Sequence, residues 1–288
     1  MRKEVAMDKN AARDASQPTA SSTPAVGTCL STYFTLLGRA IATEYAKLRY
    51  LSSTYIVVAC ALIFPIIITC VVSYLQNIAS ALGVMEQPVE SILYWTRVLG
   101  ITVFMVWGIN HVTADIKYGT FDTTYLAVPR WSVVLLAKWI SVGSIAGGGT
   151  LLVQPLLLWS QKVIFPTITQ NWSLSDHTTI TFLWAQPVLA FLSVGVAVGL
   201  GALFRSAALA ISLLLVWEFV GETVVSATPK SALAYPAMPF YNAALFAGQE
   251  QQVPALWSPG WAGVYWLVLA VVLVALGVWR LRARQREV

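Results

Sequence analysis

Charged residues are scarce in this sequence. Only 11% of its 288 residues are charged, whereas 57% are hydrophobic. A soluble domain carries roughly twice that share of charge, about 25%. The composition therefore excludes an ordinary soluble protein and predicts a polytopic membrane protein, with many of its 12 Trp and 11 Tyr at the membrane–water boundary.

Cysteine and histidine are also rare, with three and two residues. Cys29, Cys60 and Cys70 show neither metal-ligand spacing nor an even-numbered disulfide framework. Asp176 and His177 share a loop, but a closed zinc site takes four ligands. The sequence therefore predicts no metal site.

A Gly-Lys-Ser/Thr phosphate loop is missing from the sequence as well. Without its glycine-rich turn and lysine, nothing cradles the phosphates of a nucleotide. No serine–histidine pattern stands out either, which disfavours an intramembrane enzyme. We expect no catalytic residues and no cofactor bound by this chain.

The chain divides into a tail and a membrane domain. Residues 1–28 are rich in Ser, Thr, Ala and Pro and lack the apolar core of a signal peptide, so they predict a disordered cytoplasmic tail. Residues 29–288 form the transmembrane domain. Within it, six runs are long enough to cross a membrane, which takes about 20 residues. They lie near 53–75, 92–113, 133–159, 180–204, 207–225 and 261–279.

Basic residues predict the orientation of these spans. With both termini in the cytoplasm, most of the 18 Lys and Arg residues fall on or near the inner side, and only Arg97, Lys162 and Lys230 are left for the outer side. The all-α fold is thus expected to have cytoplasmic N- and C-termini.

Two segments outside the spans have patterns of their own. Residues 32–51 place Leu36, Ala40 and Leu48 at helical spacing opposite Glu44, Lys47 and Arg49, which predicts a helix lying in the inner interface. A juxtamembrane anchor without further role is the alternative. Residues 226–260 carry five prolines and are too interrupted to span, so we expect a re-entrant or interfacial cap.

The polar stretch between the second and third spans has a definite layout. Asp115 precedes Gly119 and Thr120, then Pro129 and Arg130 lead toward Ala137-Lys138. Gly119 allows a left-handed backbone at a helix end, and Pro129 gives a rigid exit into the next span. The alternative is a set of ordinary loop charges, with Lys138 as a snorkelling lysine.

This layout resembles the first cytoplasmic loop of ABC-2 type transporter permeases. Two other stretches agree with the resemblance: Glu44-x-x-Lys47-Leu-Arg49 before the first span, and Gly199-Leu-Gly-Ala-Leu-Phe-Arg205-Ser between spans four and five. The resemblance covers about residues 30–288. Asp115 departs from the glutamate that is common in the family, and Arg130 stands alone where a basic pair is frequent.

The resemblance implies an ABC-2 permease fold of the type V exporter kind in a bacterial plasma membrane. It implies pairing as a homodimer or with a sister permease, and separate nucleotide-binding subunits that hold ATP and Mg. The contact with these ATPase partners would involve the interface helix and the first cytoplasmic loop: Glu44, Lys47, Arg49, Asp115, Lys117, Gly119, Thr120, Arg130 and Lys138.

Polar residues inside the spans are candidates for a transport pathway. Glu218 and Glu222 share one face of span five, and charge at the centre of a bilayer is costly unless it faces protein or water. They border the path of a cationic or amphipathic substrate, form a structural pair with Arg97, or are protonated carboxyls bonded to a neighbouring helix. Asn110 and His111 sit near the inner end of span two, where interfacial placement is expected. A pH-sensing or substrate-contact role is the alternative, and Asn110 is kept as a candidate pathway residue.

The expected function is therefore ATP-driven export of a hydrophobic or amphipathic compound, such as a drug, antibiotic or peptide, by alternating access. The sequence singles out no cargo, and nothing in it predicts nucleic-acid binding. A non-transporting sensor or assembly protein with the same fold is the main alternative, ahead of an intramembrane enzyme.

Overall fold

A computed structural model describes residues 26–81, 94–120, 130–166, 169, 177–228, 234–249 and 253–284. The chain divides into two units, residues 1–35 and 36–288. The first helix, α1, runs across this boundary from Val26 to Tyr50, so it begins inside the predicted tail. The rest of that tail, residues 1–25, lies outside the described residues.

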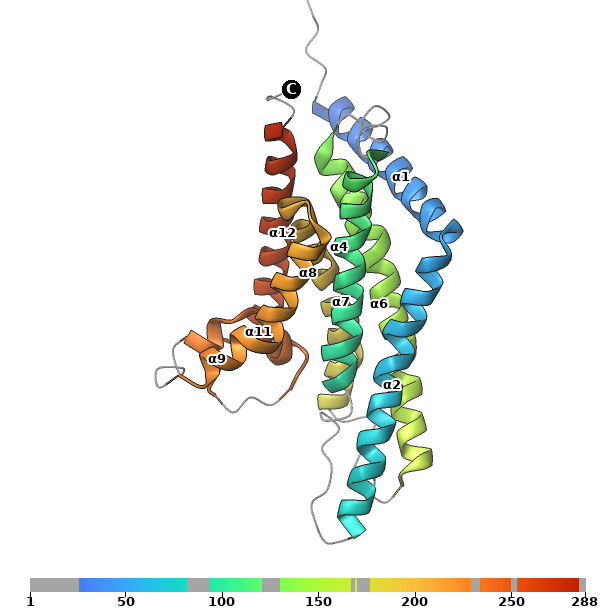
Figure 1. Cartoon of the computed structure of the whole chain (residues 1–288), viewed down its shortest axis with the longest axis vertical. Coiled ribbons are helices and arrows are strands. Elements are labelled where there is room, and N and C mark those ends of the chain that lie inside the picture. The colour runs from blue at the N-terminus through green and yellow to red at the C-terminus, as the bar shows by residue number, and fades with distance from the viewer. Residues whose placement is uncertain are drawn as a thin grey trace, which may run out of the picture. The chain divides into compact units, whose positions relative to one another are not determined.

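Every regular element in the described ranges is helical. In chain order these are α1, α2 (Ser52–Ala81), η2 (Thr96–Ile101), α4 (Thr102–Lys117), α6 (Trp131–Ile164), α7 (His177–Phe204), α8 (Ala207–Val216), η3 (Trp217–Gly221), α9 (Glu222–Ser226), η4 (Tyr235–Ala237), α11 (Pro239–Phe246) and α12 (Pro259–Arg284) (Figure 1).

Six helical stretches within these ranges are long and apolar enough to cross a membrane. They are Ser52–Ala79, Thr96–Lys117, Trp131–Ile164, Thr179–Phe204, Ala207–Ser226 and Pro259–Ala283. Each overlaps one of the six predicted runs, which are confirmed with their ends moved by a few residues. The chain is therefore a multi-pass membrane protein.

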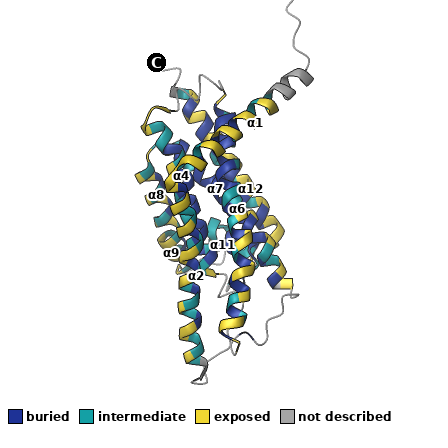
Figure 2. Ribbon diagram, turned by 90° about the vertical axis from the view of Figure 1, so that its right-hand side faces the viewer, coloured by how far each residue is buried: buried dark blue, intermediate teal, exposed yellow. Residues whose placement is uncertain are grey.

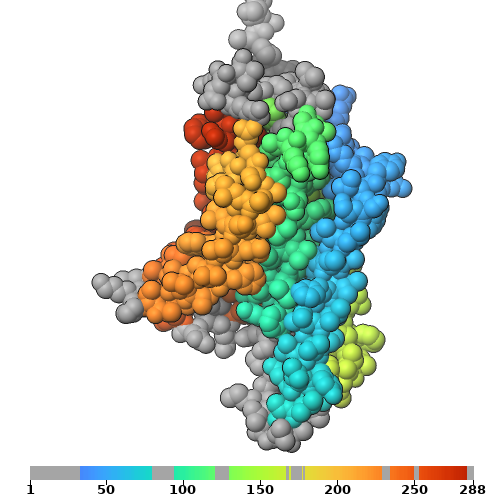
Figure 3. Space-filling model, viewed as in Figure 1, coloured from blue at the N-terminus to red at the C-terminus, as the bar shows by residue number. Residues whose placement is uncertain are grey.

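Helix α7 forms the centre of the second unit. Of its most apolar stretch, 72% is buried inside the protein, against 17% for the span that contains α8. It packs against α12, α6 and α4. Figure 2 shows the resulting dark, buried interior beside the exposed faces of α2 and α9, and Figure 3 shows α2, α4 and α8 together on one face.

Small residues let α7 approach α6 and α12 closely. A Cβ built on Gly195 would lie 2.3 Å from the Trp139 ring of α6. One on Gly199 would lie 2.5 Å from the backbone of Leu273 in α12. Because association of helices in lipid depends on close packing, these glycines specify which faces meet.

The turn between α7 and α8 takes only two residues, which is the gap left between the predicted runs 180–204 and 207–225. Helix α7 ends at Phe204, and Ser206 accepts a hydrogen bond from the backbone N–H of Leu209 at 3.4 Å to cap α8. Arg205 adopts a φ of 58°, a left-handed conformation that is uncommon outside glycine. This turn, the end of α4 and the C-terminal end of α12 lie at one end of the bundle (Figure 1).

Two π-helical segments interrupt the spans. Segment η2 contains Arg97 and leads into α4, while η3 contains Glu218 and leads into α9. Such π-segments are frequent at functional sites. A contact joins the two regions: the hydroxyl of Thr102, the residue that follows η2, lies 2.8 Å from both carboxylate oxygens of Glu218 in η3.

Between α9 and α12, the described residues form only short helices, so the prediction that 226–260 does not span is confirmed for them. The Trp266 ring N–H donates to Pro239 O at 3.0 Å, and the Tyr265 hydroxyl donates to Ala237 O at 3.2 Å. These bonds attach η4 and α11 to the first half of α12. A re-entrant position of this segment in the membrane stays a prediction.

We expect Gly199→Ala to destabilise the protein by about 1–3 kcal/mol, because the added Cβ overpacks against the backbone of Leu273, which has no flexible end to move. Thermal unfolding of the purified protein in detergent measures the change. Gly148→Ala is the matched control, since a Cβ there meets nothing within 4 Å. Equal melting temperatures for the two variants would contradict the close approach of α7 and α12.

Candidate functional site

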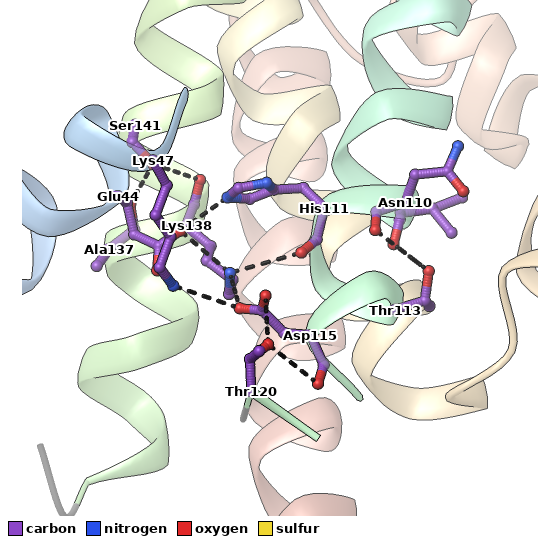
Figure 4. A network of polar contacts seen from close by, with 11 residues as sticks. Glu44, Lys47, Asn110, His111, Thr113, Asp115, Thr120, Ala137, Lys138 and Ser141 are labelled. Carbon is purple, nitrogen blue, oxygen red and sulfur yellow. Dashed lines mark hydrogen bonds and ion pairs between the residues drawn. The ribbon is translucent and has the colours of Figure 1, made fainter. Parts of the chain in front are cut away.

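A cluster of charged side chains joins three helices where α4 ends and α6 begins (Figure 4). Glu44 and Lys47 come from α1, His111 and Asp115 from α4, and Lys138 from α6. All five belong to the second unit. We call this set the ion cluster.

Glu44 is the acceptor at its centre. The Nζ of Lys47 lies 2.8 Å from Glu44 Oε1. The other oxygen, Oε2, lies 2.8 Å from His111 Nε2 and 3.1 Å from the Nζ of Lys138. One carboxylate therefore connects α1 to both α4 and α6.

Lys138 connects the same carboxylate to a second one. Its Nζ lies 2.6 Å from Asp115 Oδ2 in an ion pair, and it also donates to the backbone oxygen of His111 at 3.5 Å. Lys47 approaches Asp115 Oδ2 at 3.6 Å. The hydroxyl of Thr120 donates to Asp115 Oδ1 at 3.0 Å, which ties the start of the loop to the ion cluster.

The ion cluster is closely balanced in charge, with two carboxylates and two ammonium groups. The side chains of Lys138 and Glu44 are 0% and 3% exposed. Burial by itself would raise the pKa of the Glu44 carboxyl, but the hydrogen bond with His111 and the charge of Lys138 hold that pKa well below its usual value. Burial would lower the pKa of Lys47, yet Glu44 raises it. Both groups thus remain ionised at neutral pH.

Local helix geometry brings these groups together. Glu44 and Lys47 are three residues apart, and His111 and Asp115 are four apart, so each pair shares a helix face. The prediction that Glu44 lies opposite the apolar face of its helix is wrong. Glu44 lies between Ala40 and Leu48 at i, i+4 and i+8, and all three are buried.

The structure brings together Glu44, Lys47, Asp115, Thr120 and Lys138 from the predicted contact set. The snorkelling alternative for Lys138 is wrong, because its ammonium group is buried and paired inside the protein. Burial also suits Glu44 and Lys138 to holding helices in place rather than to touching another protein.

Other members of the predicted set lie outside the ion cluster. Arg49, Lys117 and Arg130 are exposed, and the Lys117 Nζ lies 5.5 Å from the centre of the Tyr118 ring. Gly119 has a φ of 71°, as expected for a glycine at a helix end. The predicted Pro129 turn lies outside the described residues.

His111 is the member that sequence reasoning missed. The sequence predicts interfacial placement for it, but its ring bonds to Glu44 in the ion cluster. Its position one helical turn before Asp115 was the available signal. The sequence offered no way to see that Glu44 of α1 packs against that turn.

The predicted pathway residues separate into two groups. Arg97, Glu218 and Glu222 line a common cavity. Asn110 does not line it, and its side chain is exposed nearer the other end of α4.

Glu222 has a structural role. Its two oxygens accept the backbone N–H groups of Phe240 and Tyr241 at 2.6 and 2.9 Å, which caps the first turn of α11. A structural ion pair with Arg97 is not formed in the described part of the chain. Arg97 instead donates from Nε to Gln249 Oε1 at 2.8 Å.

No group of three or more potential metal-ligating residues occurs among the described residues. The fold and sites define a multi-pass helical membrane protein with two polar centres near opposite ends of its second span. Compared with protein-family models, with curated proteins and with solved structures, the chain matches none.

We expect Lys138→Met to destabilise the protein by about 3–5 kcal/mol, because the change leaves buried carboxylates without their ammonium partner. Unfolding in detergent measures the loss. The exposed Lys117→Met is the control and should stay within about 0.5 kcal/mol of the original. Addition of Glu44→Gln to Lys138→Met should recover part of the stability, and strictly additive losses would argue against the pairing.

Acid should weaken the ion cluster. Because folding lowers the pKa of Glu44 below its usual 4.5, the stability from its ionised form is present above that pH and is lost as pH falls toward the folded value. Melting temperatures measured from pH 6 to pH 3 should fall less steeply for Glu44→Gln than for the original protein. Parallel curves would show that Glu44 is not held ionised by its partners.

Proposed function

We propose that this chain is the permease subunit of a heteromeric ATP-driven exporter, with an ABC-2 type fold. The observation that carries the proposal is the ion cluster. It joins the helix before the first span to both ends of the first cytoplasmic loop, the segment whose layout resembles the ATPase-contacting loop of that family.

The ion cluster suits transmission of force. Because Lys138 is paired with both Glu44 and Asp115, α1, α4 and α6 move together when one of them is pushed. Next to this buried set, Lys117, Gly119, Thr120 and Arg130 stand exposed, where a separate protein can reach them. In this proposal the exposed residues make the contact, and the buried ones pass the movement to the spans.

The distribution of charge supports the cytoplasmic placement of this end. Four basic residues lie at helix ends on the same side of the bundle as the ion cluster: Lys117, Arg130, Arg205 and Arg280. Arg97, in contrast, lies at the opposite end of the span that contains α4. Excess positive charge marks the cytoplasmic side of membrane proteins. Both termini would then be inside.

Transport would follow alternating access. Closure of the ATPase partners pushes the loop, and the spans that border the Arg97 cavity change from inward-open to outward-open. Directional export requires that the cargo binds these two states with different affinity. The mate of this chain in the pore is a second copy or a sister permease.

A sensor or assembly protein with this fold is the second candidate, because the ion cluster would stabilise such a protein equally well. Stimulation of ATP hydrolysis by cargo distinguishes the two, since a sensor has no cargo to move.

The tagged chain, purified from its native membrane, should bring with it an ATP-binding-cassette subunit that hydrolyses ATP. The paired change Lys117→Glu and Arg130→Glu should lower the recovered ATPase at least about tenfold, because it reverses the charge of the contact surface. Recovery is measured by mass spectrometry and by phosphate release.

Lys162→Glu is the matched control, since this lysine lies in the last turn of α6 at the opposite end. It should leave recovery unchanged. Isolation of the chain with no nucleotide-binding protein, or full recovery with the double variant, would refute the proposed coupling.

A further inference from the structure

The cavity that contains Arg97 has a volume of about 780 Å³, which is within the range of small-molecule sites. Its walls come from α2, η2, the η3–α9 segment and α11. Arg97 precedes Lys117 by 20 residues of helix. At about 1.5 Å per residue this is about 30 Å, so the cavity lies near the opposite surface of the bilayer from the ion cluster.

Arg97 offers hydrogen-bond donors to this cavity. Its Nε is engaged by Gln249 Oε1, and its guanidinium carbon lies 5.4 Å from the centre of the Tyr94 ring. The terminal nitrogens have no protein acceptor among the described residues. A guanidinium with both terminal nitrogens available matches a carboxylate or phosphate in a two-bond arrangement.

Two acceptors stand on other walls of the same cavity. Among the described residues, both oxygens of Glu218 are served only by the single hydroxyl of Thr102, which also lies within bonding distance of Val98 O. In the same part of the chain, the side-chain oxygen of Gln76 is buried and has no hydrogen-bond partner. A buried acceptor without a donor costs about 1–3 kcal/mol, so an ammonium group with three N–H donors is a suitable partner for these acceptors.

The remaining carboxylate is already satisfied. Glu222 accepts two backbone N–H groups from α11 and is 5% exposed. The cavity therefore presents one cation with free donors and one carboxylate with free acceptors. A ligand with only a cationic group would leave the terminal N–H groups of Arg97 without an acceptor among the described residues. A ligand with only an anionic group would supply no donor to Glu218 and Gln76.

We infer that this cavity binds a small zwitterionic amphiphile. Its ammonium group is held by Glu218 and Gln76, its phosphate or carboxylate by Arg97, and its apolar part by Phe219 and Phe240 on the cavity wall. A lysophospholipid headgroup and a free hydrophobic peptide share this chemistry. Binding itself needs no partner protein, and only the role of the occupant as cargo rests on the proposed function.

The purified full chain in neutral detergent tests this inference by calorimetric titration. The two zwitterionic probes are a 12-carbon lysophosphatidylethanolamine and the dipeptide leucyl-phenylalanine. Dodecylammonium and dodecanoate are the singly charged controls. We expect at least one zwitterion to bind about tenfold or more tightly than either control, and the preferred zwitterion identifies a lipid or a peptide source.

Arg97→Gln and Glu218→Gln should each weaken binding of the preferred zwitterion about tenfold or more, as loss of a charge-assisted hydrogen bond predicts. Lys162 lies outside the cavity lining, so the control variant Lys162→Gln should leave the affinity unchanged. If Arg97→Gln does not fold, Arg97→Lys replaces it. This variant keeps the positive charge but cannot form the two parallel hydrogen bonds of a guanidinium group, so it should weaken binding of the anionic group.

Equal affinity for zwitterions and singly charged amphiphiles would overturn the inference, as would unchanged affinity in the Arg97 and Glu218 variants. Tightest binding of dodecylammonium would make the cavity a cation site instead. Each of these results leaves the ATPase co-purification untouched, so the inference and the proposed function fail separately.

Discussion

Lys138 holds a full positive charge inside the protein, and the surrounding structure depends on how that charge is compensated. A buried ammonium is costly unless carboxylates face it at close range. Glu44 and Asp115 provide them at 3.1 and 2.6 Å. Because one of these acids comes from α1 and the other from α4, compensation of one charge fixes three helices relative to one another.

The two polar centres differ in how completely they are satisfied. In the ion cluster, the charges are balanced and most acceptors have donors within the protein. In the Arg97 cavity, Glu222 is satisfied by α11, but Arg97 and Glu218 keep capacity for further hydrogen bonds. Balanced groups suit a rigid joint, and unsatisfied groups suit a binding site. The separation of these roles along one span fits a protein that couples a movement at one surface to a ligand near the other.

Much of the architecture could be predicted because it depends on local properties. A run such as 180–204 must cross the membrane, since its length and apolar composition leave no other stable solution. The turn at Arg205 followed from two polar residues between two such runs. Glu44, Lys47, Asp115 and Lys138 were singled out because their segments resemble those of a known family, and spacing alone did not identify them. The sequence did not predict which face of α1 is buried, because the pattern of this helix admits two orientations until the helix packs against a partner.

The sequence by itself determined the class of protein, the number of spans and the residues rich in chemistry, because hydrophobic length and charge are properties of each segment alone. The tertiary structure decided which of those residues meet. Whether Lys138 snorkels to water or pairs in the interior, and whether Glu222 faces a ligand or caps α11, depends on groups 94 and 18 residues away in the chain. Such contacts are set by the packing of helices around α7, which no single segment encodes.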